Sequence, residues 1–300
     1  MSLDVALLGP MEVRLGPTPI RLTTGRLRTL LAVLAVSAGD TVTFERLALA
    51  LWGERLPASA RRSVQTYVTR LRRVLGRAAI RTMPDGYRLE ADPERVDVLR
   101  FRRLLAEAAR SRGTAAEPAL VEEANRLWRG PPFEGIDSDW LRASLTPYLQ
   151  ELHLGAVERR IDLRLAEGRH GELVAELLEL ASRHPLRESL WERLLVVLDR
   201  CGRQAEALAQ YERMRRRLAE ELGTDPGAEL RRLHACLLRD DPLSPSRGPE
   251  ALGVFAGRTR TLDRAGRLVE DEDGQVAGVL VLSGADGGGR TFLALVWSPA

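Results

Sequence analysis

The chain has 300 residues, of which 44% are hydrophobic and 29% are charged, and it contains two cysteines. This apolar fraction supports packed cores, whereas the apolar runs are too short to cross a bilayer and the cysteines too few for a disulfide framework. These values exclude a mostly disordered chain, a membrane-spanning protein and a disulfide-rich secreted protein. Because no secretory signal precedes the first strand, we expect a cytoplasmic, nucleoid-associated location.

Basic charge is concentrated in the N-terminal third of the sequence. All 45 basic residues are arginine. Residues 1–95 hold 15 arginines against 9 acidic residues, a balance of +6, whereas the remaining 205 hold 30 against 33, a balance of −3. This asymmetry predicts a polyanionic partner for the first segment.

Residues 1–95 have the pattern of a small α+β domain. Short β-type runs separated by Gly-Pro turns predict two or three antiparallel strands. Apolar residues at helical spacing then predict three helices. The Asp85-Gly86 pair predicts a β-hairpin turn after them. The expected strands span 5–8, 12–15, 19–22, 79–82 and 87–90, and the expected helices span 25–37, 43–53 and 59–75.

The third expected helix has two chemically different faces. At the helical repeat, Val64, Tyr67, Val68, Leu71 and Leu75 share one side, which we expect to be buried. The other side is basic and polar, and residues 55–84 contain eight arginines and no acidic residue. Arginine can bind phosphate or clamp guanine, and threonine and glutamine can contact phosphates or base edges.

This helix, with two helices before it and a hairpin after it, predicts a winged helix-turn-helix that places the third helix in the major groove of DNA. A solvated helix face with no ligand is the simpler alternative. The candidate DNA contacts on the helix and just after it are Arg61, Arg62, Gln65, Thr66, Thr69, Arg70, Arg72, Arg73 and Arg77. Those on the hairpin are Arg81, Tyr87 and Arg88.

Residues 96–240 predict an all-α domain. Helical patterns of about 12 to 20 residues follow one another with short breaks. The segment that begins at Gly168 recurs at Gly202, an offset of 34 residues. This is the period of tetratricopeptide helix hairpins, so we expect a tetratricopeptide-like stack.

Residues 241–256 are expected to form a linker, and residues 257–300 an incomplete nucleotide-binding segment. Gly284, Gly289 and Thr291 fit a phosphate-binding loop, but Arg290 stands where that loop has lysine. Nine residues after Thr291 leave no room for the rest of such a domain. We therefore expect no ATP hydrolysis and no cofactor. The histidines and cysteines show no metal-ligand spacing, so we also expect no metal.

Two groups of motifs match one known family. The N-terminal motifs lie at 28–34, 51–53, 64–73 and 86–89, and the helical motifs lie at 127–133, 168–170, 184–188, 202–208 and 220–227. In these motifs the chain resembles the Streptomyces antibiotic regulatory proteins (SARPs). The N-terminal segment is similar to the OmpR-type winged helix of that family, and the second domain is similar to its bacterial transcriptional activator domain.

The resemblance implies a transcriptional activator of a secondary-metabolite gene cluster, not an enzyme. It implies binding to direct repeats near the promoter −35 region by two protomers that contact RNA polymerase and its sigma factor. It also makes Thr24 and Arg26, at the start of the first helix, candidate phosphate contacts. The C-terminal segment is similar to the start of the ATPase domain of larger, AfsR-type members.

Two other classes of function stay open from the sequence. One is a nucleotide-dependent sensor, and the other is an interaction scaffold built on the helical repeats without DNA binding. Outside the basic helix we expect structural roles. Trp52, Trp128, Trp140 and Trp191 are expected to anchor cores, and His153, His170, His184 and His234 are expected in surface or turn positions.

Overall fold

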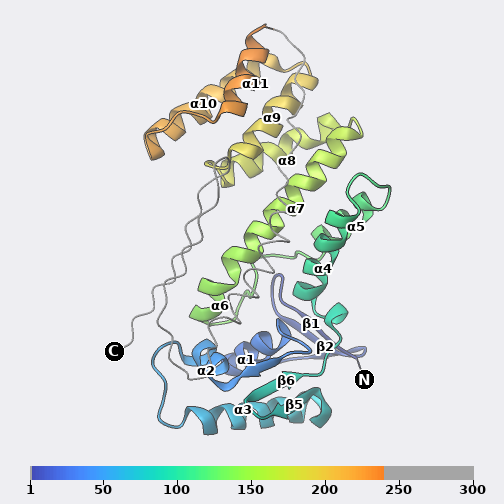
Figure 1. Cartoon of the computed structure of the whole chain (residues 1–300), viewed down its shortest axis with the longest axis vertical. Coiled ribbons are helices and arrows are strands. Elements are labelled where there is room, and N and C mark those ends of the chain that lie inside the picture. Colours follow the sequence, from blue (N-terminus) through green and yellow to red (C-terminus); the bar gives the residue numbers. More distant parts are fainter. Residues whose placement is uncertain (1, 240–300) are drawn as a thin grey trace. The chain divides into compact units, whose positions relative to one another are not determined.

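The computed structural model describes residues 2–239 of the chain (Figure 1). The expected linker and the phosphate-loop-like segment with Gly284, Gly289, Arg290 and Thr291 lie outside these residues. The described chain opens with a sheet of strands β1 (Leu3–Ala6), β2 (Glu12–Leu15) and β3 (Thr18–Ile20), which pair antiparallel in that order. Val5 pairs with Val13 and both are buried, so one face of this sheet packs on the core.

Three helices follow: α1 (Gly25–Ala35), α2 (Phe44–Trp52) and α3 (Ala60–Leu75). Thr43 caps the start of α2, where its hydroxyl accepts a hydrogen bond from the Arg46 amide at 3.3 Å, and Gly53, with φ 64°, caps its end. The helices share a core that includes Leu30, Leu47 and Leu71, all fully buried. They lie within one or two residues of the ranges predicted from the sequence.

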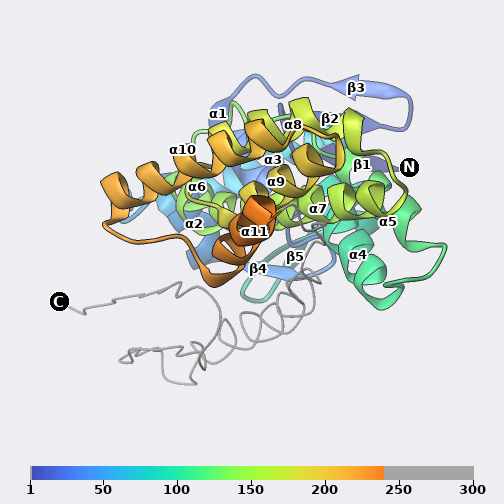
Figure 2. The same ribbon diagram turned by 90° about the horizontal axis from the view of Figure 1, so that it is seen from above.

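A second sheet completes this part of the fold. Its strands are β4 (Thr41–Thr43), β5 (Ile80–Met83) and β6 (Gly86–Leu89), in the order β4-β6-β5, with a short 3₁₀ turn, η1 (Arg77–Ala79), between α3 and β5. In Figure 2 it lies on the other side of the N-terminal helices from the first sheet. The hairpin β5–β6 is the wing, so the predicted winged helix-turn-helix is confirmed.

A 3₁₀ turn, η2 (Pro93–Arg95), leads into an all-helical region, as predicted. Its helices are α4 (Asp97–Arg110), α5 (Glu117–Arg126), α6 (Asp139–Ser144), α7 (Thr146–Ala166), α8 (His170–Arg183), α9 (Glu188–Arg200), α10 (Gln204–Leu222) and α11 (Ala228–Arg239). Helix α9 lies at the centre of the last five and contacts each of the other four. It is therefore buried on several sides, including Trp191 and Leu194 to Leu198.

The 34-residue repeat corresponds to a repeated local structure. Gly168 and Gly202 have φ of 80° and 71°, and each is followed two residues later by the first residue of a helix, α8 or α10. Arg169 pairs with Glu172, and Arg203 pairs with Glu206, at 2.6 and 2.7 Å respectively. The same turn and the same charge pair thus start equivalent helices, as expected for stacked helix hairpins.

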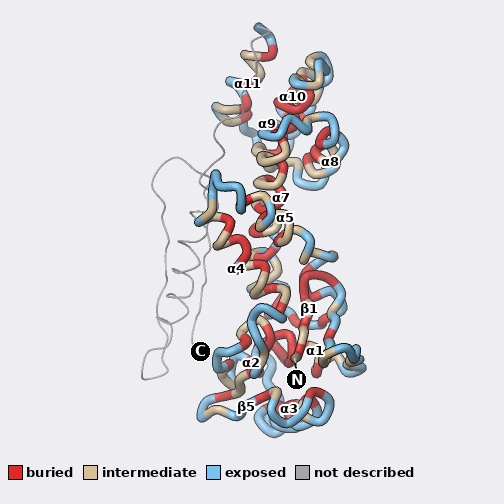
Figure 3. The backbone as a smooth tube through the Cα atoms, turned by 90° about the vertical axis from the view of Figure 1, so that its right-hand side faces the viewer, coloured by how far each residue is buried: buried red, intermediate tan, exposed pale blue. Residues whose placement is uncertain are grey.

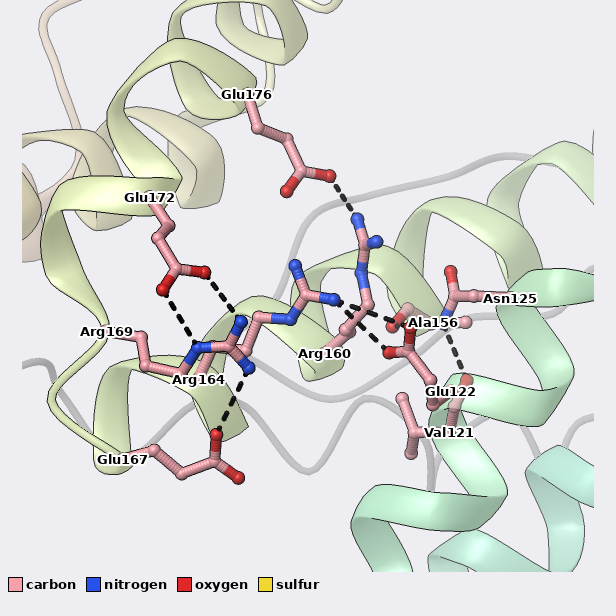
Figure 4. A network of polar contacts seen from close by, with 10 residues as sticks. All are labelled: Val121, Glu122, Asn125, Ala156, Arg160, Arg164, Glu167, Arg169, Glu172 and Glu176. Atoms are coloured by element: carbon pink, nitrogen blue, oxygen red, sulfur yellow. Dashed lines mark hydrogen bonds and ion pairs between the residues drawn. The ribbon is translucent and has the colours of Figure 1, made fainter.

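Charge pairs connect the helices of this region (Figure 4). Arg160 and Arg164 on α7 reach Glu176 on α8 and Glu122 on α5, respectively. Deeper in the fold, Glu117 is almost fully buried and accepts hydrogen bonds from Arg159 at 2.6 and 2.8 Å. Breaking a buried pair leaves one charge uncompensated, so such pairs fix how neighbouring helices align.

The segment after β1 joins the helical region rather than extending the strand. The Asp97 carboxylate accepts hydrogen bonds from the amides of Leu7 and Leu8 at 2.8 and 2.9 Å. The carbonyls of Leu7 and Leu8 in turn accept from the amides of Phe133 and Arg129, each at 2.8 Å. The predicted strand at 5–8 is therefore shifted to Leu3–Ala6, because these backbone groups bond to residues beyond 96.

Two of the histidines expected in surface or turn positions are half-buried and stacked on aromatic rings. His234 on α11 stacks on Tyr211 with ring centroids 3.9 Å apart. His153 is half-buried on α7, and its ring stacks on Trp128 with centroids 4.0 Å apart and planes 10° apart. Phe101 borders the same pair. Burial, with a smaller contribution from the Arg160 charge, lowers the pKa of His153 to about 4. This imidazole is therefore a neutral aromatic packing group at neutral pH.

Candidate nucleic-acid interface

Helix α3 is anchored to the protein by one apolar face. Val64, Val68, Leu71 and Leu75 are buried, and the helix packs against α1 and α2. Tyr67 is half-buried at the edge of this face, with its ring 6.3 Å from that of Trp52. The inner face predicted from the sequence is therefore confirmed.

The opposite face of α3 is exposed (Figure 3). Within residues 2–239, the guanidinium groups of Arg62, Arg70, Arg73 and Arg77 have no hydrogen bond or ion pair. Such cations create a local positive potential with no internal counter-ion. The exposed predicted contacts on this face and at its end are Arg61, Arg62, Gln65, Thr66, Thr69, Arg70, Arg73 and Arg77.

The two threonines on this face have their hydroxyl groups bonded to the helix itself. Thr66 Oγ1 donates to the carbonyl of Arg62, and Thr69 Oγ1 donates to the carbonyl of Gln65, both at 2.9 Å. Each bond spans one helical turn. The methyl groups and the hydroxyl lone pairs are the parts that remain available to a ligand.

Arg61 and Arg72 differ from the other arginines because the protein itself holds their side chains. The Arg61 guanidinium lies 4.7 Å from the centroid of the Phe44 ring, a cation–π contact with the start of α2. Arg72 is half-buried and donates from Nε to the Ile80 carbonyl at 2.9 Å and from Nη2 to Thr82 Oγ1 at 2.7 Å. Arg72 therefore links α3 to the first strand of the wing.

The wing carries its predicted basic residues, together with an acidic residue, Glu90, that no sequence motif marks as part of the site. Arg81 and Arg88 are register partners on β5 and β6. Both approach Glu90, at 3.4 and 2.8 Å, and the Arg81 side chain is 64% exposed. Tyr87 is half-buried and pairs with Val42 of β4. Glu90 follows Arg88 by two residues, the spacing that places two side chains on one face of a strand.

The start of α1 provides the remaining predicted contacts. Thr24 is the residue before the helix and is exposed, and its side chain makes no capping hydrogen bond. Arg26, in the first turn, is half-buried. No acidic residue lies in that turn, so the partial positive charge of the helix N-terminus is not offset there.

Comparison with known proteins gives two matches that divide the chain. The model of the family "Transcriptional regulatory protein, C terminal" matches residues 18–89, and that of the "Bacterial transcriptional activator domain" matches residues 96–238. The regulatory protein DnrI of Streptomyces peucetius is 34% identical over 83% of this chain and 96% of its own length. The chain belongs to the SARP family.

Other relatives show how this SARP chain compares with longer proteins. The regulatory protein AfsR of Streptomyces griseus is 35% identical over 98% of this chain, but the chain spans only 32% of its length. A solved structure of Mycobacterium tuberculosis EmbR in complex with a low-affinity phosphopeptide has 32% identity and a TM-score of 0.75. That match covers 92% of this chain and 74% of that one. The relatives are transcriptional regulators, so the coarse function predicted for this SARP, transcriptional activation, is confirmed.

Two further findings concern only residues 2–239 of this SARP. Its helices there are not long and apolar enough to cross a membrane. The same residues contain no group of three or more His, Cys, Asp or Glu side chains suited to a metal ion.

Proposed function

We propose that this SARP activates transcription by binding double-stranded DNA through the outer face of α3. The observation that carries the proposal is the set of exposed arginines whose guanidinium groups have no partner among the described residues. A helix of this kind fits the major groove, where arginine clamps guanine O6 and N7 and also contacts phosphates. The apolar inner face keeps the helix fixed while the outer face meets the duplex.

The individual residues take different parts in this proposal. Sequence selection comes from side chains at the centre of the outer face, and phosphate contacts come from its ends, from the start of α1 and from the wing. Arg72 instead positions the wing against α3. The selecting residues are Arg62, Thr66, Thr69, Arg70 and Arg73, and the residues at the edges are Thr24, Arg26, Arg61, Gln65, Arg77, Arg81, Tyr87 and Arg88.

The finer assignments rest on the family. Residues 1–95 form the DNA-binding domain, and residues 96–240 form the activator domain that pairs two protomers on direct repeats near the −35 region. The complex contacts RNA polymerase and its sigma factor, and the target is a secondary-metabolite gene cluster. Residues 241–256 act as a linker. Residues 257–300 are a phosphate-loop remnant that binds no nucleotide, because Arg290 replaces the lysine that reaches the phosphates.

A selection from a random duplex library, followed by footprinting on the upstream regions of neighbouring genes, tests the proposal. We expect one enriched sequence and a protected region that contains it twice in the same orientation. The absence of any enriched sequence would favour a scaffold that does not bind DNA. Calorimetric titration with ATP tests the other alternative, a nucleotide-dependent sensor. We expect no heat of binding, whereas micromolar affinity for ATP would favour the sensor.

A further inference from the structure

We propose that Thr66 and Thr69 recognise thymine through their methyl groups, so that the centre of the reading face selects A·T pairs. This inference rests on the proposed function, because it concerns what the outer face of α3 reads. It assigns a specific chemistry to two residues that the sequence places only among general candidates for phosphate or base contact.

The position of the two threonines makes them central. Residues 62, 66, 69 and 73 follow one another at steps of four, three and four, so at 3.6 residues per turn they share one side of the helix. Thr66 and Thr69 are exposed and lie between Arg62 and Arg73. A short side chain in the middle of the face lets the helix approach the floor of the groove, whereas the longer arginines reach bases or phosphates at either end.

The hydroxyl hydrogen bonds determine what these side chains can offer. In this conformation each hydroxyl proton is donated to a backbone carbonyl at 2.9 Å, so donation to a phosphate or to guanine would require breaking that bond. A hydroxyl has one donor and two acceptor sites, so only acceptor capacity remains. The other available group on each side chain is a methyl.

Few groups in the major groove can interact with a methyl group and a hydroxyl that only accepts hydrogen bonds. Guanine N7 and O6 are acceptors and need a donor, which the neighbouring arginines supply and these threonines do not. The thymine methyl is the apolar group of the groove, and threonine methyl is one of its usual partners. An acceptor-only hydroxyl can accept a hydrogen bond from adenine N6, on the same base pair, or from cytosine N4. The hydroxyl is therefore compatible with A·T but does not select it, and the methyl contact is what favours thymine.

Matched changes on protein and DNA separate the methyl from the hydroxyl. On the protein, Thr69→Ser removes the methyl and Thr69→Val removes the hydroxyl while keeping a β-branched side chain, and the same pair is made at Thr66. On the DNA, the probe is the duplex enriched by the wild-type chain, with each thymine replaced in turn by deoxyuridine. Thr114→Ser is the control, because that hydroxyl also donates to a backbone carbonyl (Ser111, 2.7 Å) but lies between α4 and α5.

We expect deoxyuridine at one or two positions to weaken wild-type binding about three- to fivefold, the scale of one buried methyl. The Thr→Ser variants should lose a similar factor and then become insensitive to deoxyuridine at the matching position. The Thr→Val variants keep a methyl group and should keep the wild-type sensitivity to deoxyuridine at the matching position. Thr114→Ser should stay within about twofold of wild type. Circular dichroism confirms that each variant is folded.

Several results would overturn the inference. A loss of tenfold or more in Thr→Val with Thr→Ser unchanged would assign the contact to the hydroxyl, and insensitivity of the wild type to every deoxyuridine would remove the methyl contact. These failures leave DNA binding intact. A wild-type chain that enriches no duplex would instead overturn the proposed function, and this inference with it.

Discussion

Arginine residues that look equivalent in the sequence occupy different environments on and around α3. Arg73 is exposed with no partner among residues 2–239, Arg61 lies over an aromatic ring, and Arg72 bonds to the wing. A guanidinium that is already bonded is less available to DNA than one that meets only water. Sequence periodicity identifies the face of the helix but not which of its side chains the rest of the protein uses.

Arg73→Ala is expected to weaken binding to the selected duplex by about 1 to 3 kcal/mol if Arg73 clamps a guanine. Folding should be unaffected, because the side chain has no described contact to lose. Fluorescence anisotropy at several salt concentrations measures the effect. A phosphate contact would instead weaken all sequences alike and reduce the salt slope by about one. Arg126→Ala, on the exposed side of α5, is the matched control, and unchanged binding by the Arg73 variant would remove Arg73 from the interface.

His153 is expected to make the protein sensitive to acid. Its pKa is about 4 in the folded state, below the ordinary value of 6.5, so the unfolded state binds more protons between these values. The free energy of unfolding should therefore fall as pH drops from about 6.5 towards 4, by roughly 1 to 2 kcal/mol after allowing for partial exposure. In urea titrations between pH 7 and 4.5, the free energy of unfolding of His153→Phe should fall less with decreasing pH than that of the wild type, because the variant lacks the imidazole. Equal pH dependence in the two proteins would show that the imidazole is not held neutral.

At the scale of elements, the helices were easier to predict than the strands. Helices α1 to α3 carry their own periodicity and end signals, so the sequence places them closely. Strand β4 was missed because Thr41–Thr43 has only three residues and becomes a strand by pairing with β6, more than forty positions later. The Asp85-Gly86 turn predicts the wing. Its attachment to α3 depends on hydrogen bonds from Arg72 to groups eight and ten positions later in the sequence, which helical periodicity does not reveal.

Gly86→Ala tests how tightly the wing is attached. A Cβ at this position would lie 2.0 Å from the Val42 carbonyl oxygen, and backbone atoms of a paired strand cannot move away cheaply. We expect a loss of about 1 to 3 kcal/mol in stability and weaker DNA binding through the displaced wing.

Gly155→Ala is the matched control for this change. Gly155 lies within α7, and nothing is within 4 Å of its Cβ position. Alanine is the better helix former, so this variant should gain about 0.5 to 1 kcal/mol. Thermal unfolding measures both variants, and a stable Gly86→Ala protein with normal binding would contradict the tight β4–β6 contact.

At the scale of the whole molecule, the N-terminal strand segment and the helical region share hydrogen bonds. The Asp97 carboxylate accepts hydrogen bonds from two backbone amides of that segment. Burial raises the pKa of this carboxyl even though those hydrogen bonds act to lower it. Two further bonds come from other elements: Thr29 on α1 donates to the Asp137 carbonyl at 3.2 Å, and Ser138 donates to the Ala50 carbonyl at 2.7 Å. The sequence divides these parts by composition, but it does not reveal the bonds between them.

Asp97→Ala is expected to destabilise the protein by about 1 to 3 kcal/mol, because the Leu7 and Leu8 amides lose their acceptor in a largely buried position. Hydrogen exchange at these two amides should accelerate more than exchange in the core of α9. Asp4→Ala is the control, since Asp4 forms an exposed ion pair with Arg95 that should contribute less than about 1 kcal/mol. Slow exchange at Leu7 and Leu8 in the Asp97 variant would show that other groups hold this segment.

Arginine-specific chemical labelling of the chain with and without the selected duplex, read by mass spectrometry, tests directly whether the outer face of α3 binds DNA. All basic residues of the sequence are arginine, so the reagent reports on every positive side chain. DNA is predicted to protect Arg62, Arg70, Arg73 and Arg77 strongly, while Arg126 on α5 and Arg200 at the end of α9 stay reactive. Protection confined to arginines of α4 to α11, with the outer face of α3 still labelled, would show that DNA binds elsewhere on the chain.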